Sequence, residues 1–206
     1  MVIKLTESDK LLISSAITDA ERITSAEIAV VITPASDGYA SHNFLIGLVL
    51  GGVICSCLWF LGIAVSFPFL FSVQLLVICM VVFVPFLRNF CIYLIPKNIQ
   101  LHRAAHRAYS EYMTVSRNVP AFVPVVLLYI SLAEHYAHII ADRAVMEKTQ
   151  DEAWDNVIKE FIAGMKTSSI CDSCINAINK IAVQLTGHFP ASQNPNYIGD
   201  HIIETK

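Results

Sequence analysis

The sequence predicts an α/β protein with a small mixed sheet sandwiched by helices and an inserted transmembrane helical hairpin. Two apolar runs, at about residues 27–33 and 123–132, have the length and β-branched content of buried strands. Amphipathic helical patterns precede the first run and follow the second. Between the runs, positions 38–87 hold no Asp, Glu, Lys or Arg, although about 25% of residues are charged in typical soluble proteins.

The first strand follows a helix. Thr6 and Asp9 stand at capping-box spacing, so a helix is expected over about Glu7–Arg22. The run Glu27–Thr33 is apolar on both faces, a pattern typical of a central strand covered on both sides. Pro34 and the small residues after it then indicate a loop.

The uncharged segment contains two apolar runs, at about Phe44–Val65 and Phe69–Leu87. Each has roughly the 20 residues with which a helix crosses about 30 Å of hydrocarbon. Only Ser66–Pro68 separates them, so they are expected to form an antiparallel hairpin. A buried pair of core helices is the alternative, but soluble cores rarely hold 50 uncharged positions in a row. The polar N-terminus does not resemble a signal peptide.

A polar helix is expected over about Lys97–Ser116, close to the second span. Its residues His102, Arg103, His106 and Arg107 predict a basic face that contacts anionic lipid headgroups. The spacing of His102 and His106 would also suit a metal pair, but the Glu of an HExxH motif is absent. Because Lys and Arg follow the second span and are missing from the turn, both termini are expected in the cytoplasm.

Two further strands and two helices complete the domain. The second strand, Val123–Leu132, is expected parallel to the first through a right-handed crossover. The third, Tyr136–Asp142, is expected antiparallel to it after a tight turn. Helices follow capping-box signals at Thr149–Glu152 and Ser169–Asp172. The tail after these helices is expected to be loose or to fold back along the domain.

Cysteine content and net charge exclude two further classes. Cys171 and Cys174 form a CxxC, but neither further zinc ligands at suitable spacing nor a preceding strand and turn accompany it. A structural position on one side of a helix is the favoured interpretation. The net charge of −3 argues against nucleic acid as a partner, because nucleic-acid binders usually present a strongly basic face.

Three segments of the sequence resemble the TPM domain family: Thr24–Val31, Leu128–Tyr136 and Ile139–Arg143. Trp154 and His188–Pro190 fit the same pattern. The chain is most similar to the bacterial membrane-anchored subgroup, which has two transmembrane spans inserted in the domain. The sequence departs from the family where glycines are usual: at Ala26, at Ala144 and in Lys166–Cys174. The tail motif Asn194–Asp200 matches only in part.

The resemblance implies a discontinuous α/β domain over residues 1–40 and 96–190, a transmembrane hairpin over 44–90, and a tail over 191–206. It implies a multi-pass protein of the bacterial inner membrane. One plant member of the family is described as an acid phosphatase, and some bacterial members are described as binding divalent cations such as calcium. Family membership therefore indicates the fold more firmly than the activity.

Two sets of polar residues are candidate sites. Glu27 and Asp142 lie in the family motifs and at the same end of the predicted sheet, where two carboxylates could hold Ca²⁺ or Mg²⁺. Alternatively, Glu27 pairs with Arg143, or each carboxylate caps a backbone terminus. The opposite end carries Thr33, Asp37 and Glu134, and open α/β sheets usually bind ligands outside the carboxyl ends of their parallel strands.

No strong catalytic signature accompanies these residues. Walker A, GxSxG and GxGxxG motifs are absent, and Ser131, Glu134 and His135 do not make a triad by sequence proximity alone. The leading hypothesis is a binding or accessory module at the cytoplasmic membrane surface. Its partners would be the lipid bilayer and a membrane protein complex. A divalent-cation-dependent acid phosphatase and an anionic-lipid-binding membrane organiser are the alternatives.

Overall fold

The computed structural model describes residues 5–63, 66–84, 87, 90–149, 151–191, 197–198 and 203–204. The chain forms two compact units, one of Met1–Ser36 with Arg103–Lys206 and the other of Asp37–His102. The division falls a few residues from the expected boundaries at 40 and 96, and the C-terminal tail belongs to the first unit. We call these the α/β unit and the hairpin unit.

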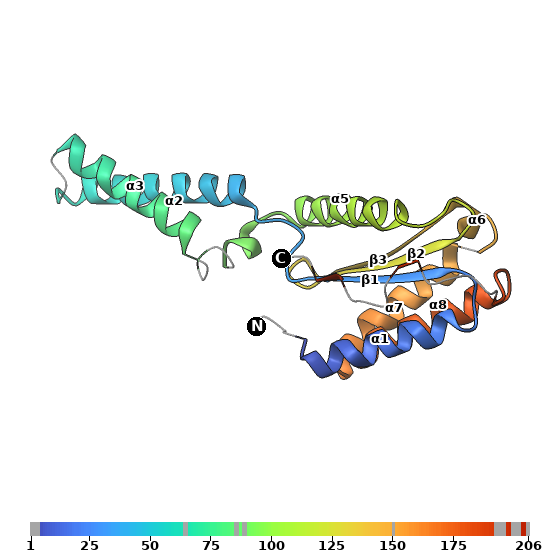
Figure 1. Ribbon diagram of the computed structural model, residues 1–206. Helices are drawn as coiled ribbons and strands as arrows, with labels where there is room; N and C mark the ends of the chain where they lie inside the picture. The colour runs from blue at the N-terminus through green and yellow to red at the C-terminus, as the bar shows by residue number, and fades with distance from the viewer. Residues whose placement is uncertain are drawn as a thin grey trace. The chain divides into compact units, whose positions relative to one another are not determined.

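The α/β unit is built on a mixed sheet with strand order β3-β2-β1-β4 (Figure 1). The two central strands are parallel, with Glu27 opposite Val125 and Thr33 opposite Ser131. β3 is antiparallel to β2, and the short β4 is parallel to β1. This confirms the expected order of the three long strands and adds β4, so Ile203 and Glu204 of the tail lie beside β1. The strands are β1 (Glu27–Thr33), β2 (Val125–Ser131), β3 (Tyr136–Ala141) and β4 (Ile203–Glu204).

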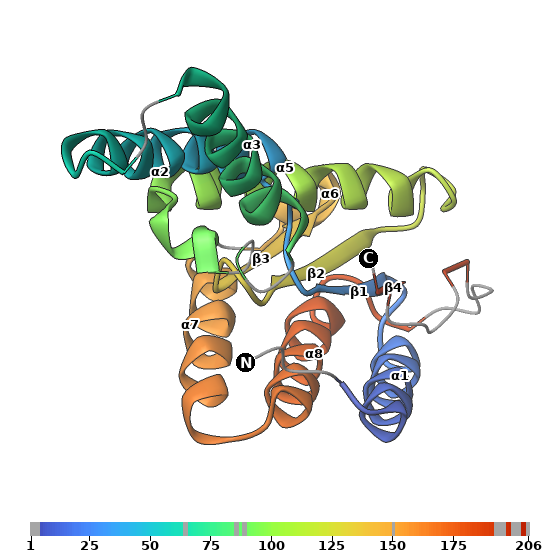
Figure 2. The same ribbon diagram turned by 90° about the vertical axis from the view of Figure 1, so that its left-hand side faces the viewer.

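Helices cover both faces of the sheet, which confirms the α/β class (Figure 2). On one face, α1, α7 and α8 lie side by side. The described turns of α5 from Arg103 onward cover the other, where Ala108, Tyr112 and Val115 join side chains of β1 and β2 in a second apolar layer. The helices are α1 (Glu7–Glu21), α5 (Lys97–Ser116), α6 (Arg143–Met146), α7 (Asp151–Thr167) and α8 (Ile170–Thr186).

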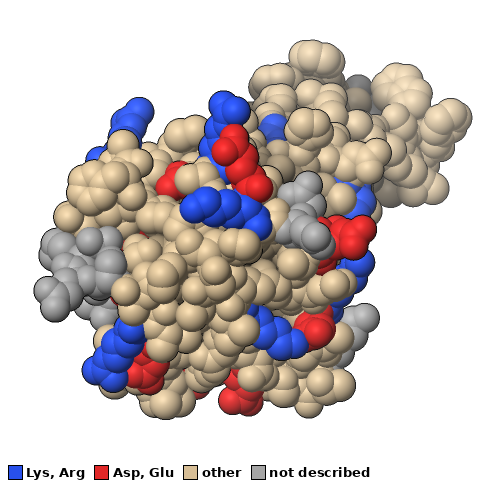
Figure 3. All heavy atoms as spheres, turned by 90° about the vertical axis from the view of Figure 1, so that its right-hand side faces the viewer, with Lys and Arg blue, Asp and Glu red and all other residues tan. Residues whose placement is uncertain are grey.

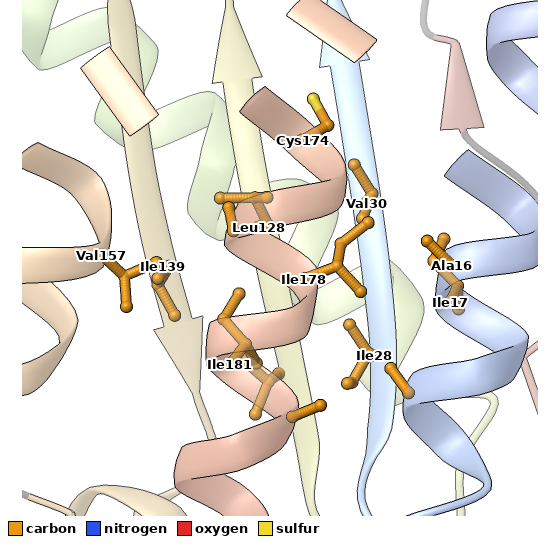
Figure 4. Close-up of a cluster of buried hydrophobic side chains, with 14 of the residues drawn as sticks. Ala16, Ile17, Ile28, Val30, Leu128, Ile139, Val157, Cys174, Ile178 and Ile181 are labelled. Atoms are coloured by element: carbon orange, nitrogen blue, oxygen red, sulfur yellow. The ribbon is translucent and has the colours of Figure 1, made fainter. Parts of the chain in front are cut away.

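The larger core lies between the sheet and the three-helix face. Figure 4 shows Ile178 and Ile181 of α8 among side chains from β1, β2 and β3. Every residue of β1 and β2 is buried, because each strand is covered on both faces. That is the reason these strands read as continuous apolar runs and not as alternating ones.

Helix ends agree with the capping signals in two of three cases. Thr6 and Asp9 form the expected capping box of α1, and the Ser169 hydroxyl accepts the amide of Asp172 at the start of α8. Thr149 differs, since its hydroxyl donates to the carbonyl of Val145 and accepts from the Trp154 indole. It therefore links the short α6 to α7.

The described part of the hairpin unit includes α2 (Ala40–Phe60), α3 (Phe67–Phe83), a 3₁₀ turn, η1 (Ile92–Leu94), and the first residues of α5. The two helices are antiparallel neighbours. Gly47 faces Ile78, Gly51 faces Gln74, and the Cys55 thiol donates to the carbonyl of Leu70.

Both helices occupy the expected segments, although the predicted span ends at Val65 and Leu87 were too late: α2 ends at Phe60 and α3 at Phe83. Val65 itself lies outside the described residues. Among the described residues, α2 is the one helix long and apolar enough to cross a membrane, and α3 is a shorter apolar helix of 17 residues.

Candidate functional site

A buried polar network lies at the carboxyl ends of β1 and β2. At its centre is the carboxylate of Glu134, which is 0% exposed. Its two oxygens accept the backbone amide of Ser36, at 3.0 and 3.2 Å, and one also accepts the Ser131 hydroxyl. The Ser36 and Tyr129 hydroxyls are 2.9 Å apart and hydrogen-bonded. We call Ser36, Tyr129, Ser131 and Glu134 the carboxyl-end network.

Local backbone geometry brings these residues together. The ladder between the parallel strands continues beyond their ends, because the amides of Leu132 and Ala133 donate to the carbonyls of Thr33 and Pro34. His135 then adopts a left-handed φ of 51° and closes the turn into β3. Glu134 is thereby held inward, next to the loop that leaves β1.

α5 adds an ion pair to this end of the unit. The Arg107 guanidinium lies 2.8 Å from the carboxylate of Glu111, a residue that is largely buried. Burial raises the pKa of Tyr129, and the Glu134 carboxylate raises it further, whereas the Ser36 hydrogen bond and Arg107 lower it. Tyr129 therefore stays protonated at neutral pH and can donate a hydrogen bond.

The amino end of the sheet carries the predicted metal pair, Glu27 and Asp142. The Glu27 carboxylate accepts the amides of Tyr197 and Ile198, at 3.1 and 3.2 Å. The Asp142 carboxylate accepts the amide of Val125, at 2.7 Å, and the Tyr112 hydroxyl. Burial and the bond to Asp142 raise the pKa of Tyr112 well above its ordinary value.

The strand register gives the distance between the backbone positions of Glu27 and Asp142. Glu27 is opposite Val125 on one side of β2, and Asp142 bonds to Val125 on the other. Two strand spacings therefore separate their Cα atoms, about 10 Å. The side chains of Glu27 and Asp142 both lie on the side of the sheet that α5 covers. Their observed partners, however, are mainly backbone amides, as for carboxylates that cap backbone groups. No group of three or more His, Cys, Asp or Glu suited to a metal occurs among the described residues, so cation binding stays a prediction.

Arg143 does not make the ion pair with Glu27 that sequence reasoning left open. Its Nε lies 2.7 Å from Glu147, one turn further along the exposed surface. Asp142 and Arg143 also line a hollow of about 460 Å³ whose walls include Phe122 and Phe189. Figure 3 looks onto this end of the α/β unit, where Lys, Arg, Asp and Glu of both signs are scattered over a largely uncharged surface.

The remaining predicted site residues are spread over both units. The Thr33 hydroxyl donates to the carbonyl of Ala35, in the same loop as Ser36. Asp37 begins the hairpin unit and accepts the amide of Tyr39 there. The structure therefore groups Glu134 with Ser36, Tyr129 and Ser131, and it adds two residues of this end that sequence reasoning missed as site residues, Ser36 and Tyr129.

The predicted lipid-contact residues divide in the same way. His102 is the last residue of the hairpin unit, and Arg103 begins the second segment of the α/β unit. His106 is exposed, whereas Arg107 is half-exposed and paired with Glu111. Part of the basic charge on α5 is therefore neutralised within the helix.

Cys171 and Cys174 lie buried on α8, as expected for structural thiols. Burial raises the pKa of Cys174 to about 12, and burial with Asp9 and Asp172 nearby raises that of Cys171. Thiols with raised pKa values are poor nucleophiles and poor metal ligands at neutral pH. The CxxC spacing thus reflects two core positions on one helix face.

Comparison with known proteins identifies the fold and no more. No family model matches the chain, and no curated protein matches it. The NMR structure of the BA42 protein from the psychrophilic bacterium Bizionia argentinensis sp. nov. is similar, with a TM-score of 0.61 and 15% sequence identity. The similarity covers 98% of this chain and 97% of that one. At this identity it shows a shared fold and carries no activity.

Proposed function

We propose that the protein is a membrane-anchored binding or accessory module in which α2 and α3 form a transmembrane hairpin inserted in a TPM-like α/β domain. The observation that carries the proposal is the surface of α2. Only 17% of an 18-residue apolar stretch of α2 is buried. A core helix of a soluble protein would be mostly buried, whereas this one leaves its apolar side chains uncovered.

The interior of the hairpin also suits a bilayer. Backbone groups of a helix are hydrogen-bonded within it, and a polar side chain in hydrocarbon needs a partner. Gln74 has one, since its amide nitrogen donates to the carbonyl of Leu48 at 3.0 Å. The 17 residues of α3 span about 26 Å, at the lower end of the range for a membrane helix.

Binding is favoured over catalysis because the acidic side chains at both ends of the sheet hold parts of the chain itself. Glu27 accepts two backbone amides, and Glu134 and Asp142 each accept one backbone amide and one hydroxyl. Arg88, Lys97, Arg103 and Arg107 support a cytoplasmic position for the α/β unit through the positive-inside rule. The TPM resemblance supports an accessory role beside a membrane protein complex.

Alkaline carbonate extraction of membranes tests the anchor. The full chain should stay in the membrane pellet, and Val49→Arg, near the middle of α2, should shift it to the supernatant. A cationic side chain at the centre of a span costs about 2.5–3.5 kcal/mol of insertion free energy. Val183→Arg is the matched control, because Val183 is a valine on α8 that is at least as exposed as Val49 (68% against 58%). Release of the unsubstituted chain by carbonate would refute the anchor.

Topology is tested separately by labelling. A cysteine placed at Ser66, in the predicted turn, should react with a membrane-impermeant maleimide in intact cells. A cysteine placed at Arg117, which is exposed on the α/β unit, should react only after lysis. The reverse pattern would leave the anchor in place but move the α/β unit to the outer side.

Divalent-cation binding is the second candidate, favoured by the presence of Glu27 and Asp142 at one end of the sheet. Titration of the full chain with Ca²⁺ or Mg²⁺ would then shift the amide resonances of Tyr197, Ile198 and Val125, which donate to these carboxylates. Glu27→Gln should abolish the shifts. Flat titrations of both ions would remove this candidate and, with it, the cation-dependent phosphatase.

A further inference from the structure

β3 lies at one end of the strand order, and its outer edge pairs with no other described strand. In the β2–β3 ladder the amide of Asp142 donates to Val125, so the even-numbered residues of β3 bond to β2. On the other side of β2, the amide of Leu132 donates to Thr33 of β1. Even-numbered residues of β2 therefore bond to β1 and odd-numbered ones to β3, which agrees with this assignment. Within the described residues, the amides and carbonyls of Ala137, Ile139 and Ala141 therefore point away from the sheet with no partner of this chain.

The other edge of the sheet is protected. The Glu21 carboxylate accepts the outward amide of Ile28 at 3.0 Å, and β4 pairs with β1 at Val31 and Ile32. Free sheet edges are usually blunted by charged residues, proline, a bulge or a covering segment. β3 reads Tyr-Ala-His-Ile-Ile-Ala, with neither charge nor proline, and its register with β2 is unbroken over six pairs.

We propose that β3 pairs antiparallel with β3 of a second copy, about a twofold axis at Ile139, so that two sheets join into one. In this register Ile139 faces its symmetry mate, and Ala137 faces Ala141 of the partner subunit. Each of these residues donates one hydrogen bond and accepts one across the seam. The inference does not depend on the membrane proposal.

Self-complementarity favours a second copy over an unrelated strand. An axis at Ile139 pairs odd-numbered residues with odd-numbered ones, so the side chains that face α7 and α8 stay on one face of the joined sheet. The residues at the seam on that face are Ala137, Ile139 and Ala141, of which two are small enough to face each other without collision. Interfaces between identical chains are most often twofold and isologous of this kind.

The opposite face of the seam carries His138 and Ile140. His138 is exposed, and its ring centre lies 6.0 Å from that of Tyr136. Burial lowers the pKa of His138, and Asp155 opposes this in part. The ring is thus neutral at pH 7, and the two copies meet without like charges facing each other.

The mass of the full chain in detergent, corrected for bound detergent, gives the first test. We expect a concentration-dependent dimer in which the amides of Ala137, Ile139 and Ala141 exchange slowly. Ala137→Pro removes one outward amide per copy without breaking the β2 ladder, and edge strands tolerate proline there. It should weaken dimerisation at least tenfold. Ala144→Pro, at an exposed alanine in the first turn of α6, is the control and should not weaken it.

A charge pair gives a second test that does not rely on proline. The two copies of position 138 lie diagonally across the seam, within reach of long side chains. His138→Glu and His138→Lys should each weaken the dimer several-fold, and an equimolar mixture of the two variants should restore it. His188→Glu changes an exposed histidine elsewhere and should have no effect.

Three outcomes would overturn the proposal. One is a monomer at every concentration, and another is a dimer unchanged in folded Ala137→Pro and His138→Glu, which would assign the contact to another surface. The third is slow exchange at Ala137, Ile139 and Ala141 in a chain of monomer mass. That result would show that a strand other than a second copy covers the edge.

Discussion

The α/β unit buries its apolar side chains, whereas α2 of the hairpin unit exposes most of its large apolar side chains. In the α/β unit, β1 and β2 are buried at every position. In α2 the buried residues are Asn43, Gly47 and Gly51, while large apolar side chains such as Leu48 and Val49 are exposed. Small and polar residues thus form the buried side of α2. Similar apolar composition therefore forms a buried core in the α/β unit and an exposed surface on α2.

Removing one leucine from each unit would test this difference most strongly. Leu128→Ala deletes a fully buried side chain of β2 and should lower the free energy of unfolding by about 2–5 kcal/mol. Leu48→Ala removes a side chain that is 45% exposed and should cost less than about 0.5 kcal/mol. Amide exchange of β2 measures the first loss and amide exchange of α2 measures the second, both in detergent-solubilised protein. Equal losses would mean that α2 packs as a core helix.

The α/β unit also differs from the hairpin unit in the buried carboxylate of Glu134. Glu134→Ala leaves the Ser36 amide and the Ser131 hydroxyl without their acceptor and should cost about 1–3 kcal/mol in unfolding free energy. Glu147→Ala breaks an exposed pair with Arg143 and should cost less than about 1 kcal/mol. Thermal or denaturant unfolding of the two variants side by side decides the matter. If Glu134→Ala were as mild as its control, the carboxyl-end network would contribute little to the fold.

Much of the fold could be predicted because periodicity and length report burial directly. The run at Glu27–Thr33 and the capping box at Thr6 led to the observed strand and helix. β4 could not be found, because a two-residue strand has no pattern of its own and depends on the position of the finished β1 edge. Thr149 followed a capping-box spacing, but tertiary contact with the Trp154 indole took its hydroxyl.

The site was less predictable because hydrogen-bond partners come from distant parts of the chain. The position of Glu27 and Asp142 at one end followed from strand direction, and the register agrees with it. Their partners did not follow: Tyr197 lies 170 positions from Glu27, and Tyr112 lies 30 positions from Asp142. Glu134 was singled out by the rule on strand ends, whereas Ser36 had only its place in the loop after β1 as a signal.

The packing inside the hairpin permits a finer test with two adjacent glycines. A methyl group added at Gly51 would lie 2.7–2.8 Å from the Gln74 amide, so Gly51→Ala should displace it from Leu48. Interhelical hydrogen bonds in membranes are worth about 0.6 kcal/mol, or roughly a threefold change in an equilibrium. Gly52→Ala meets no atom within 4 Å and is the control. Maleimide labelling of Cys55, read by peptide mass, should quicken in the first variant only.

The smallest expected effect is on the α/β unit alone, where Tyr112 should make the free energy of unfolding depend on pH in the alkaline range. Burial and the Asp142 carboxylate raise the pKa of Tyr112 in the folded protein, whereas the unfolded chain ionises near the ordinary value of 10.0. Above pH 10 the unfolded state therefore binds fewer protons than the folded state, and stability falls as pH rises. Tyr112→Phe should reduce that slope, although at neutral pH it loses the bond to Asp142. Denaturant midpoints between pH 8 and 11 measure this. An unchanged slope would mean that the Tyr112–Asp142 contact does not hold the tyrosine in its neutral form.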